Sequence, residues 1–235
     1  MDDGARRAQL AASLAEVGER IERACADAGR PAGDVTLTAV TKTYPASDVL
    51  LLAGLGVTDV GENRDQEAAP KAAEVRAAGA ELRWHYVGRL QRNKAKSVAA
   101  YADVVESVDS VRLAAALDRA ALDRGTPLDV LIQVSIDGDQ ERGGAAGDDL
   151  GRISDAVASS DGLRLRGLMA VAPLGWEPDR AFARLAELRS GLVAAHPDAT
   201  TLSAGMSGDL EAAIRHGATH VRIGTSLLGM RNLLR

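Results

Sequence analysis

VRIGTS, at residues 221–226, is a strand-like segment that runs into a turn of small residues, and LSAGMSGD, at residues 202–209, has the same form. Loops of this kind offer hydroxyls and unhindered backbone N–H groups where a helix begins, a favourable place to bind phosphate. Near the other end of the chain, the apolar run Val35–Val40 leads directly to Thr41 and Lys42. Two such loops and a lysine at a strand's end suggest a phosphorylated aldehyde held as a Schiff base.

The rest of the chain alternates between apolar strand-like runs and helical patterns. Such strands are typical of a parallel sheet buried on both faces, and their alternation with helices favours a single (β/α)8 TIM-type barrel over an open doubly wound sheet. Apolar residues spaced three and four apart between Leu10 and Cys25 predict a helix before the first strand. The predicted strands are Val35–Val40, Thr58–Gly61, Trp84–Val87, Val104–Val108, Val130–Ile136, Leu165–Val171, Thr201–Ser203 and His220–Ile223.

Local signals place some helix boundaries. Ser47 is the expected N-cap of a helix over Val49–Leu55, because its hydroxyl can accept a hydrogen bond from the first turn. Pro70 is expected to bend or divide a helix that runs from Arg64 to about Ala78. Acidic residues suit a helix start, so Asp148 and Asp149 are expected to begin the helix that reaches Ser159.

Composition limits the class of protein. The 235 residues, 46% of them apolar, can form one domain over 1–235, since α/β barrels often have this length. A net charge of -5 argues against nucleic acid as a partner, and no apolar run is long enough to span a membrane or to serve as a signal peptide. Cys25 is the single cysteine, so no intrachain disulfide can form, and no residue group has metal-ligand spacing. We expect a cytoplasmic protein.

A barrel would bring the polar residues at its strand ends together. Active sites of this fold lie at the carboxyl ends of the strands, and phosphate is often held after strands seven and eight. Residues expected at this mouth are Lys42, Asn63, His85, Gly88, Ser135, Ser203, Ser207, Arg222, Gly224, Thr225 and Ser226.

Six segments, spread in order over nearly the whole chain, carry a family resemblance. They are AVTK (39–42), GENRDQE (61–67), WHYVGRLQRNK (84–94), RGLMA (166–170), GMS (205–207) and VRIG (221–224). The chain thereby resembles the pyridoxal phosphate homeostasis protein family, whose barrel is similar to the N-terminal domain of alanine racemase. Two small departures, Arg142 where lysine is common and Gly208 where an acid is frequent, leave the exact phosphate donors open.

The resemblance implies a cofactor and a set of roles. Family members bind pyridoxal 5'-phosphate (PLP) as a Schiff base and are regarded as PLP carriers or regulators without established catalysis. By position, Lys42 matches the Schiff-base lysine, Arg222 the residue facing the pyridine nitrogen, and Asn63 a neighbour of the ring. Ser207, Gly224 and Thr225 match phosphate-holding positions, with Ser203 nearby. We expect a monomer whose partners are PLP and apo PLP-dependent enzymes.

An arginine at position 222, facing the ring nitrogen, has a chemical consequence that does not depend on the family resemblance. Arginine stays protonated and has no acceptor, so it would disfavour the pyridinium form of the ring, whereas enzymes that use PLP as a full electron sink usually place an acid there. The tyrosines all lie in the first half, and the sequence stops at Arg235 without the β-rich domain that supplies the second base of alanine racemases. Efficient two-base racemisation is therefore not expected.

Three function classes remain open at this point. A PLP carrier is favoured by the full motif set, a small PLP-dependent amino-acid racemase would require measurable turnover, and a phosphosugar aldolase would purify without a chromophore. His85 is expected to be a structural histidine rather than a base. The basic run Arg89, Arg92, Lys94 and Lys96 is either a solvated helix face or an anion-binding or partner-docking patch.

Overall fold

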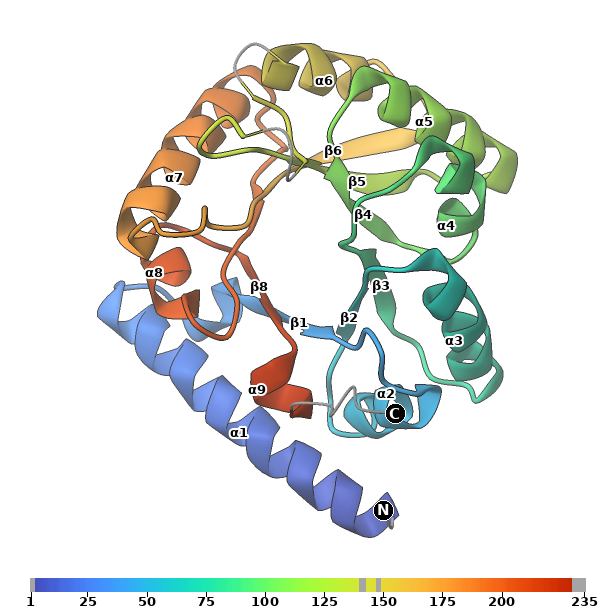
Figure 1. Cartoon of the computed structure of the whole chain (residues 1–235), viewed down its shortest axis with the longest axis vertical. Coiled ribbons are helices and arrows are strands. Elements are labelled where there is room, and N and C mark those ends of the chain that lie inside the picture. The colour runs from blue at the N-terminus through green and yellow to red at the C-terminus, as the bar shows by residue number, and fades with distance from the viewer. Residues whose placement is uncertain (1–2, 140–142, 147–148, 230–235) are drawn as a thin grey trace.

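The strands close into a barrel with helices outside it (Figure 1). The computed structural model describes residues 3–139, 143–146 and 149–229. All neighbouring strands pair in parallel and in sequence order, and β8 returns to pair with β1. The predicted (β/α)8 barrel is confirmed. Its strands are β1 Thr36–Val40, β2 Asp59–Glu62, β3 Arg83–Tyr86, β4 Val104–Val108, β5 Leu128–Gln133, β6 Leu163–Met169, β7 Thr201–Ser203 and β8 His220–Ile223.

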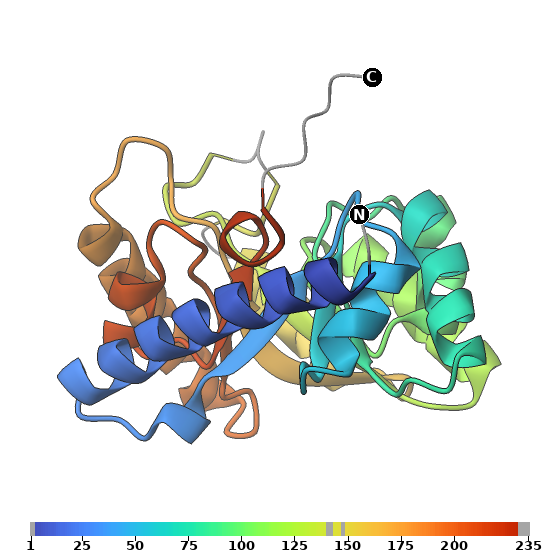
Figure 2. The same ribbon diagram turned by 90° about the horizontal axis from the view of Figure 1, so that it is seen from below.

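Helices cover the outside of the strands because their apolar residues pack on the outer face of the barrel. The predicted first helix, α1, lies across the outside of the barrel (Figure 2) and packs against α2, α8 and α9. The helices are α1 Asp3–Asp27, α2 Ala46–Ala53, α3 Asp65–Ala77, α4 Ala95–Tyr101, α5 Val111–Arg124, α6 Asp149–Ala158, α7 Pro178–Ala195, α8 Leu210–Arg215 and α9 Thr225–Leu228, with short 3-10 turns η1 Ala32–Asp34 and η2 Arg92–Lys94.

One expected helix boundary is wrong, and of the two effects expected of Pro70 the division of its helix does not occur. Ser47 lies inside α2, whose N-cap is Pro45, because proline has a backbone suited to a helix start and no N–H to satisfy there. Pro70 does not divide α3, which is continuous from Asp65 to Ala77. The hydrogen bond that Pro70 cannot make would go to the carbonyl of the exposed Gln66, which water can satisfy. Asp149 begins α6 as expected, whereas Asp148 and Arg142 lie outside the described residues.

The fifth and sixth strands begin earlier than expected. β5 and β6 each start two residues before the predicted position, and β5 ends at Gln133, after which Val134 still donates a backbone hydrogen bond to Met169 of β6. The polar side chains Asp129, Arg164 and Arg166 at the amino ends of these strands hid their true starts. In the described part of the chain, no helix is long and apolar enough to cross a membrane.

Candidate functional site

Lys42 lies just beyond β1 on a firmly held piece of backbone. The carbonyl of Thr41 accepts a 2.9 Å hydrogen bond from the buried Lys71, and the Thr41 hydroxyl donates to Glu62 at 2.6 Å. Lys71 also donates to the same Glu62 oxygen at 2.6 Å. Lys42 itself is exposed, and its ammonium makes no hydrogen bond or ion pair with any described residue. The fold thus fixes the backbone before Lys42 and leaves its amine available.

The turn after Lys42 is strained. Thr43 has a φ of 69°, a left-handed conformation that a β-branched residue rarely adopts, and its N–H donates to Glu67 at 3.1 Å. Strain of this kind persists only where the surroundings enforce it, and it concentrates at functional sites.

The two loops predicted to bind phosphate do meet. The N–H of Ser226, in the first turn of α9, donates to the Ser207 hydroxyl at 3.4 Å. Gly224, which precedes α9, lies against the end of β1, because a Cβ there would be 3.4 Å from the Val40 carbonyl oxygen. The ends of β7, β8 and β1 are therefore adjacent, and together they form what we call the cradle: Ser207, Gly224, Thr225 and Ser226.

Helix α1 holds the cradle from outside. Arg20 donates to the Ser207 carbonyl at 3.0 Å and pairs with Glu211 at 2.8 Å. Arg6 donates to the Leu228 carbonyl at the end of α9 and pairs with Asp48. The Ser207 loop and the end of α9 are thus both hydrogen-bonded, through backbone carbonyls, to the same helix α1. These bonds limit how far the two segments can move apart.

Below the mouth, a chain of buried polar side chains crosses the barrel interior. Arg222 donates to the Ser203 hydroxyl at 2.7 Å and to the Ala170 carbonyl at 2.8 Å, just past the end of β6. Ser203 in turn donates to Glu106 at 2.6 Å. His85 lies between Glu106 and Asp59, at 2.7 and 2.8 Å. We call these five residues, Asp59, His85, Glu106, Ser203 and Arg222, the interior network.

The interior network has shifted pKa values. Burial disfavours a charged imidazole, but hydrogen bonds to Asp59 and Glu106 outweigh it and raise the pKa of His85 to about 9. Burial also disfavours a charged Glu106, yet contacts with His85, Arg222 and Ser203 lower its pKa to about 2. Burial lowers the pKa of Arg222, which Glu106 opposes. Opposite charges therefore alternate along the network, and both ring nitrogens of the buried His85 are engaged within it, as expected of a structural histidine.

The structure separates the predicted site residues into two groups. Lys42, Asn63, Ser207, Gly224 and Thr225 lie at the mouth, beyond their strands. Arg222 and Ser203 lie in the interior, where Ser203 is fully buried and its hydroxyl is engaged by Glu106 and Arg222. Ser203 thus supports Arg222 instead of facing the cradle. Its role as a phosphate neighbour and the cofactor roles of the others remain predictions.

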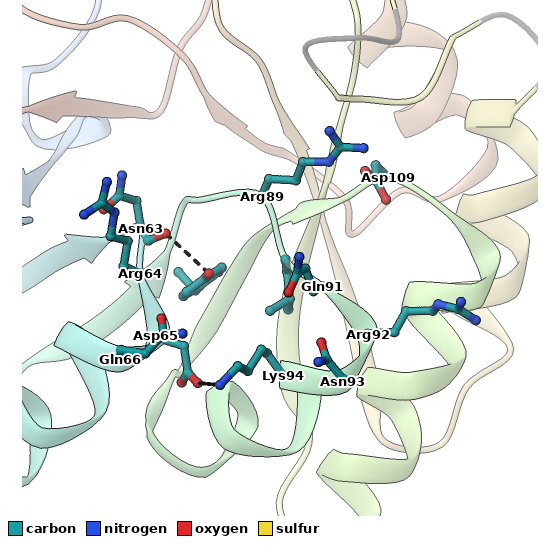
Figure 3. Close-up of a pocket in the computed structure, with 12 residues that line it drawn as sticks. Asn63, Arg64, Asp65, Gln66, Arg89, Gln91, Arg92, Asn93, Lys94 and Asp109 are labelled. Atoms are coloured by element: carbon teal, nitrogen blue, oxygen red, sulfur yellow. Dashed lines mark hydrogen bonds and ion pairs between the residues drawn. The ribbon is translucent and has the colours of Figure 1, made fainter.

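Asn63 follows the end of β2, the neighbour of the strand that Lys42 follows. Val40 pairs with Gly61, so two further residues bring the chain to Lys42 on one side and to Asn63 on the other. The N-cap of α3 is Arg64, so Asn63 does not cap that helix. Asn63 also lines a groove of about 1000 Å³ that lies between the start of α3 and the β3–α4 connection (Figure 3).

Sequence reasoning missed Glu62, Lys71 and Glu106 as parts of the site. Glu106 was detectable as the one charged residue in the apolar run of β4, and Glu62 ends β2 beside Asn63. Lys71 gave no signal, because a lysine in an Ala- and Glu-rich helix normally points to solvent. No metal-binding group of His, Cys, Asp and Glu occurs in the described residues.

A closed parallel barrel with a lysine past its first strand and a small-residue cradle after its last two belongs to the class of (β/α)8 barrels that carry their site at the carboxyl ends of the strands. The family model for the N-terminal domain of alanine racemase matches residues 13–232. The chain is 47% identical to the pyridoxal phosphate homeostasis protein of Mycobacterium tuberculosis, over 97% of this chain and 95% of that protein. It belongs to the pyridoxal phosphate homeostasis protein family.

Solved structures agree with this assignment. The structure of PipY from Synechococcus elongatus with PLP bound is 34% identical, with a TM-score of 0.82 over 94% of this chain and all of that one. The alanine racemase of Corynebacterium glutamicum is only 14% identical, with a TM-score of 0.69 over 95% of this chain and 62% of that one. This second likeness concerns the fold alone.

Proposed function

We propose that this protein binds PLP at the mouth of the barrel and holds it for delivery to apo PLP-dependent enzymes, without turning over amino acids itself. The observation that carries the proposal is the meeting of Ser207 with the start of α9 beside the strand end that bears Lys42. The relative PipY, solved with PLP bound, supports the same cofactor.

The residues present fit this cofactor. When bound, PLP supplies an aldehyde that condenses with a primary amine and releases water. Lys42 provides an amine with no partner among the described residues, on backbone fixed by Lys71 and Glu62. The cradle provides the hydroxyls of Ser207, Thr225 and Ser226 and the backbone at the start of α9 for a phosphate.

Arg222 argues for a carrier over a racemase. Its guanidinium is held by Ser203 and Ala170, leaving other N–H donors to meet a pyridine nitrogen. A fixed donor cation keeps that nitrogen unprotonated and so weakens carbanion stabilisation. We further propose that the protein acts as a monomeric single domain over 1–235 in the cytoplasm.

The test combines loading, transfer and turnover. The protein incubated with PLP and passed through gel filtration should retain a near-ultraviolet or visible absorbance band. Added to an apo aminotransferase together with alkaline phosphatase, which destroys free cofactor, it should restore activity faster than free PLP does. Chiral chromatography should show no racemisation of alanine above that by free PLP. A kcat near 1 s⁻¹ or more that disappears in Lys42→Ala would establish the racemase instead.

A further inference from the structure

The segment 89–94 contributes most of one wall of the groove beside Asn63, and PLP binding gives it no role (Figure 3). The facing wall comes from the start of α3. We call this cleft the basic groove. Its lining residues are Asn63, Arg64, Asp65, Gln66, Tyr86, Arg89, Leu90, Gln91, Arg92, Asn93, Lys94 and Asp109.

The basic groove is positively charged on a chain whose net charge is -5. Its cations outnumber its carboxylates, and of the carboxylates Asp65 is partly neutralised by Lys94 at 3.6 Å. The side chains of Arg89 and Arg92 are exposed, and their guanidinium groups form no hydrogen bond or ion pair within the described ranges. Two unpaired guanidinium groups here produce a local positive field that attracts acidic partners over about a Debye length, roughly 10 Å.

The groove has the character of a docking surface more than of a small-molecule pocket. Small-molecule pockets are mostly apolar with a few fixed polar groups. Here the apolar floor is limited to Tyr86 and Leu90, and the walls are long charged and amide side chains, many of them exposed. Arginine is enriched in protein interfaces, where charge complementarity raises association rates.

The basic groove is in direct contact with the mouth of the barrel. Gly88 packs so closely on Asn63 that a Cβ would lie 2.2 Å from the Asn63 carbonyl oxygen, and the Tyr86 hydroxyl donates to that oxygen at 3.4 Å. Asn63 and Lys42 follow the ends of the neighbouring strands β2 and β1, two residues past the pair Gly61 and Val40. A partner seated on Arg89 and Arg92 would therefore lie beside the amine that we propose holds PLP.

We propose that the basic groove docks an acidic surface of the enzyme that receives the cofactor. This rests on the proposed carrier function. The groove places the recipient next to the mouth, so that PLP leaving Lys42 is captured before it diffuses away.

Charge reversal tests the groove separately from cofactor binding. We expect Arg89→Glu/Arg92→Glu to retain the PLP content of the wild type, because neither residue belongs to the cradle or the interior network. Its rate of transfer to the apo aminotransferase at low salt should fall at least about tenfold, and the difference should shrink near 0.5 M salt. The matched control is Arg119→Glu/Arg164→Glu, two exposed arginines outside the groove with the same change of charge.

A direct binding measurement separates failure of the groove from failure of the carrier function. Fluorescence anisotropy with a fluorescein-labelled decaglutamate peptide at low salt should show binding by the wild type and the control variant, and at least tenfold weaker binding by the groove variant. Equal binding by all three, no binding by the wild type, or tighter binding of a single-stranded RNA than of the peptide would overturn the proposal. Transfer no faster than from free PLP would refute the carrier function, while equal transfer by both variants would refute only the docking.

Discussion

The interior network and the mouth above it are both polar, but they differ in how completely the fold satisfies them. In the interior, both nitrogens of His85 and both oxygens of Glu106 and of Asp59 have hydrogen-bond partners. At the mouth, the Lys42 ammonium has no partner among the described residues, and the Ser207 hydroxyl accepts one long hydrogen bond, from Ser226. The two regions share β2, β7 and β8, which carry Asp59, Ser203 and Arg222 of the interior and lead to Asn63, Ser207 and Gly224 of the mouth.

This difference indicates two functions. Burying charge is unfavourable unless each charge is paired, so the interior network is a structural unit that orients Arg222 and is sensitive to loss of any member. The mouth keeps its donors exposed to water at little cost to folding, so its residues can be changed without unfolding the protein. Substitutions at the mouth should therefore alter PLP binding, and substitutions in the interior should alter stability.

The largest expected effect is at Lys42. Lys42→Ala should abolish the adduct that sodium borohydride traps with PLP, because it removes the one mouth lysine placed for the Schiff base, while the unfolding midpoint changes only slightly. Mass spectrometry after reduction measures the first effect and thermal melting the second. Lys96→Ala, at an exposed lysine on α4, is the control and should trap PLP normally. Full stoichiometric trapping on another lysine in Lys42→Ala would contradict the assignment.

The second largest expected effect is the pH dependence of the free energy of unfolding, which comes from His85 and Glu106 in the interior network. The pKa of His85 rises from 6.5 to about 9 on folding, so its contribution is complete below pH 6.5 and is lost as the pH rises through 9. The pKa of Glu106 falls from 4.5 to about 2, so its contribution is complete above pH 4.5 and is lost as the pH falls through 2. The free energy of unfolding should therefore be highest between pH 4.5 and 6.5.

Urea unfolding across this pH range measures the effect. In the wild type, we expect the free energy of unfolding to fall by about 3 kcal/mol as the pH rises from 6.5 to above 9. His85→Gln should be destabilised and should lack this alkaline decline, whereas His216→Gln, at a histidine paired with Asp179 on the surface, should retain it. An unchanged decline in His85→Gln would show that another group is responsible.

The contrast between the regions also explains what could be predicted from sequence. The mouth was predictable because its residues follow apolar runs directly, and a barrel brings all strand ends together. The interior network was not predictable, because the contact of His85 with Glu106 depends on how β3 and β4 pair. A single charged residue in an apolar strand does not indicate which residue it contacts. The starts of β5 at Leu128 and of β6 at Leu163 were missed because the charged residues Asp129 and Arg164 follow them directly and interrupt the apolar pattern.

The third effect is moderate and confined to the cradle. Ser207→Ala should weaken PLP binding by about 0.5–3 kcal/mol, the range from an ordinary hydrogen bond to one with a charged group. It should weaken the binding of pyridoxal, which lacks the phosphate, much less. Equilibrium titration followed by absorbance gives both values. Ser190→Ala, on the outer helix α7, is the control. Equal losses for the two ligands would rule out a phosphate role for Ser207.

The smallest expected effect is at Thr43, where one substitution should change stability and PLP affinity in opposite directions. A left-handed conformation costs a residue with a side chain roughly 1–2 kcal/mol, and glycine loses about 0.5–1 kcal/mol of conformational entropy on folding. Thr43→Gly should therefore raise the free energy of unfolding by up to about 1 kcal/mol, whereas Thr126→Gly, at an exposed threonine without positive φ, should lower it. Because the strained turn also directs Lys42, the same Thr43→Gly protein should bind PLP more weakly. In Thr43→Gly, urea unfolding should therefore show a higher free energy of unfolding, and titration should show a lower affinity for PLP. If stability and affinity both rose or both fell, the strain at Thr43 would have no part in positioning the lysine.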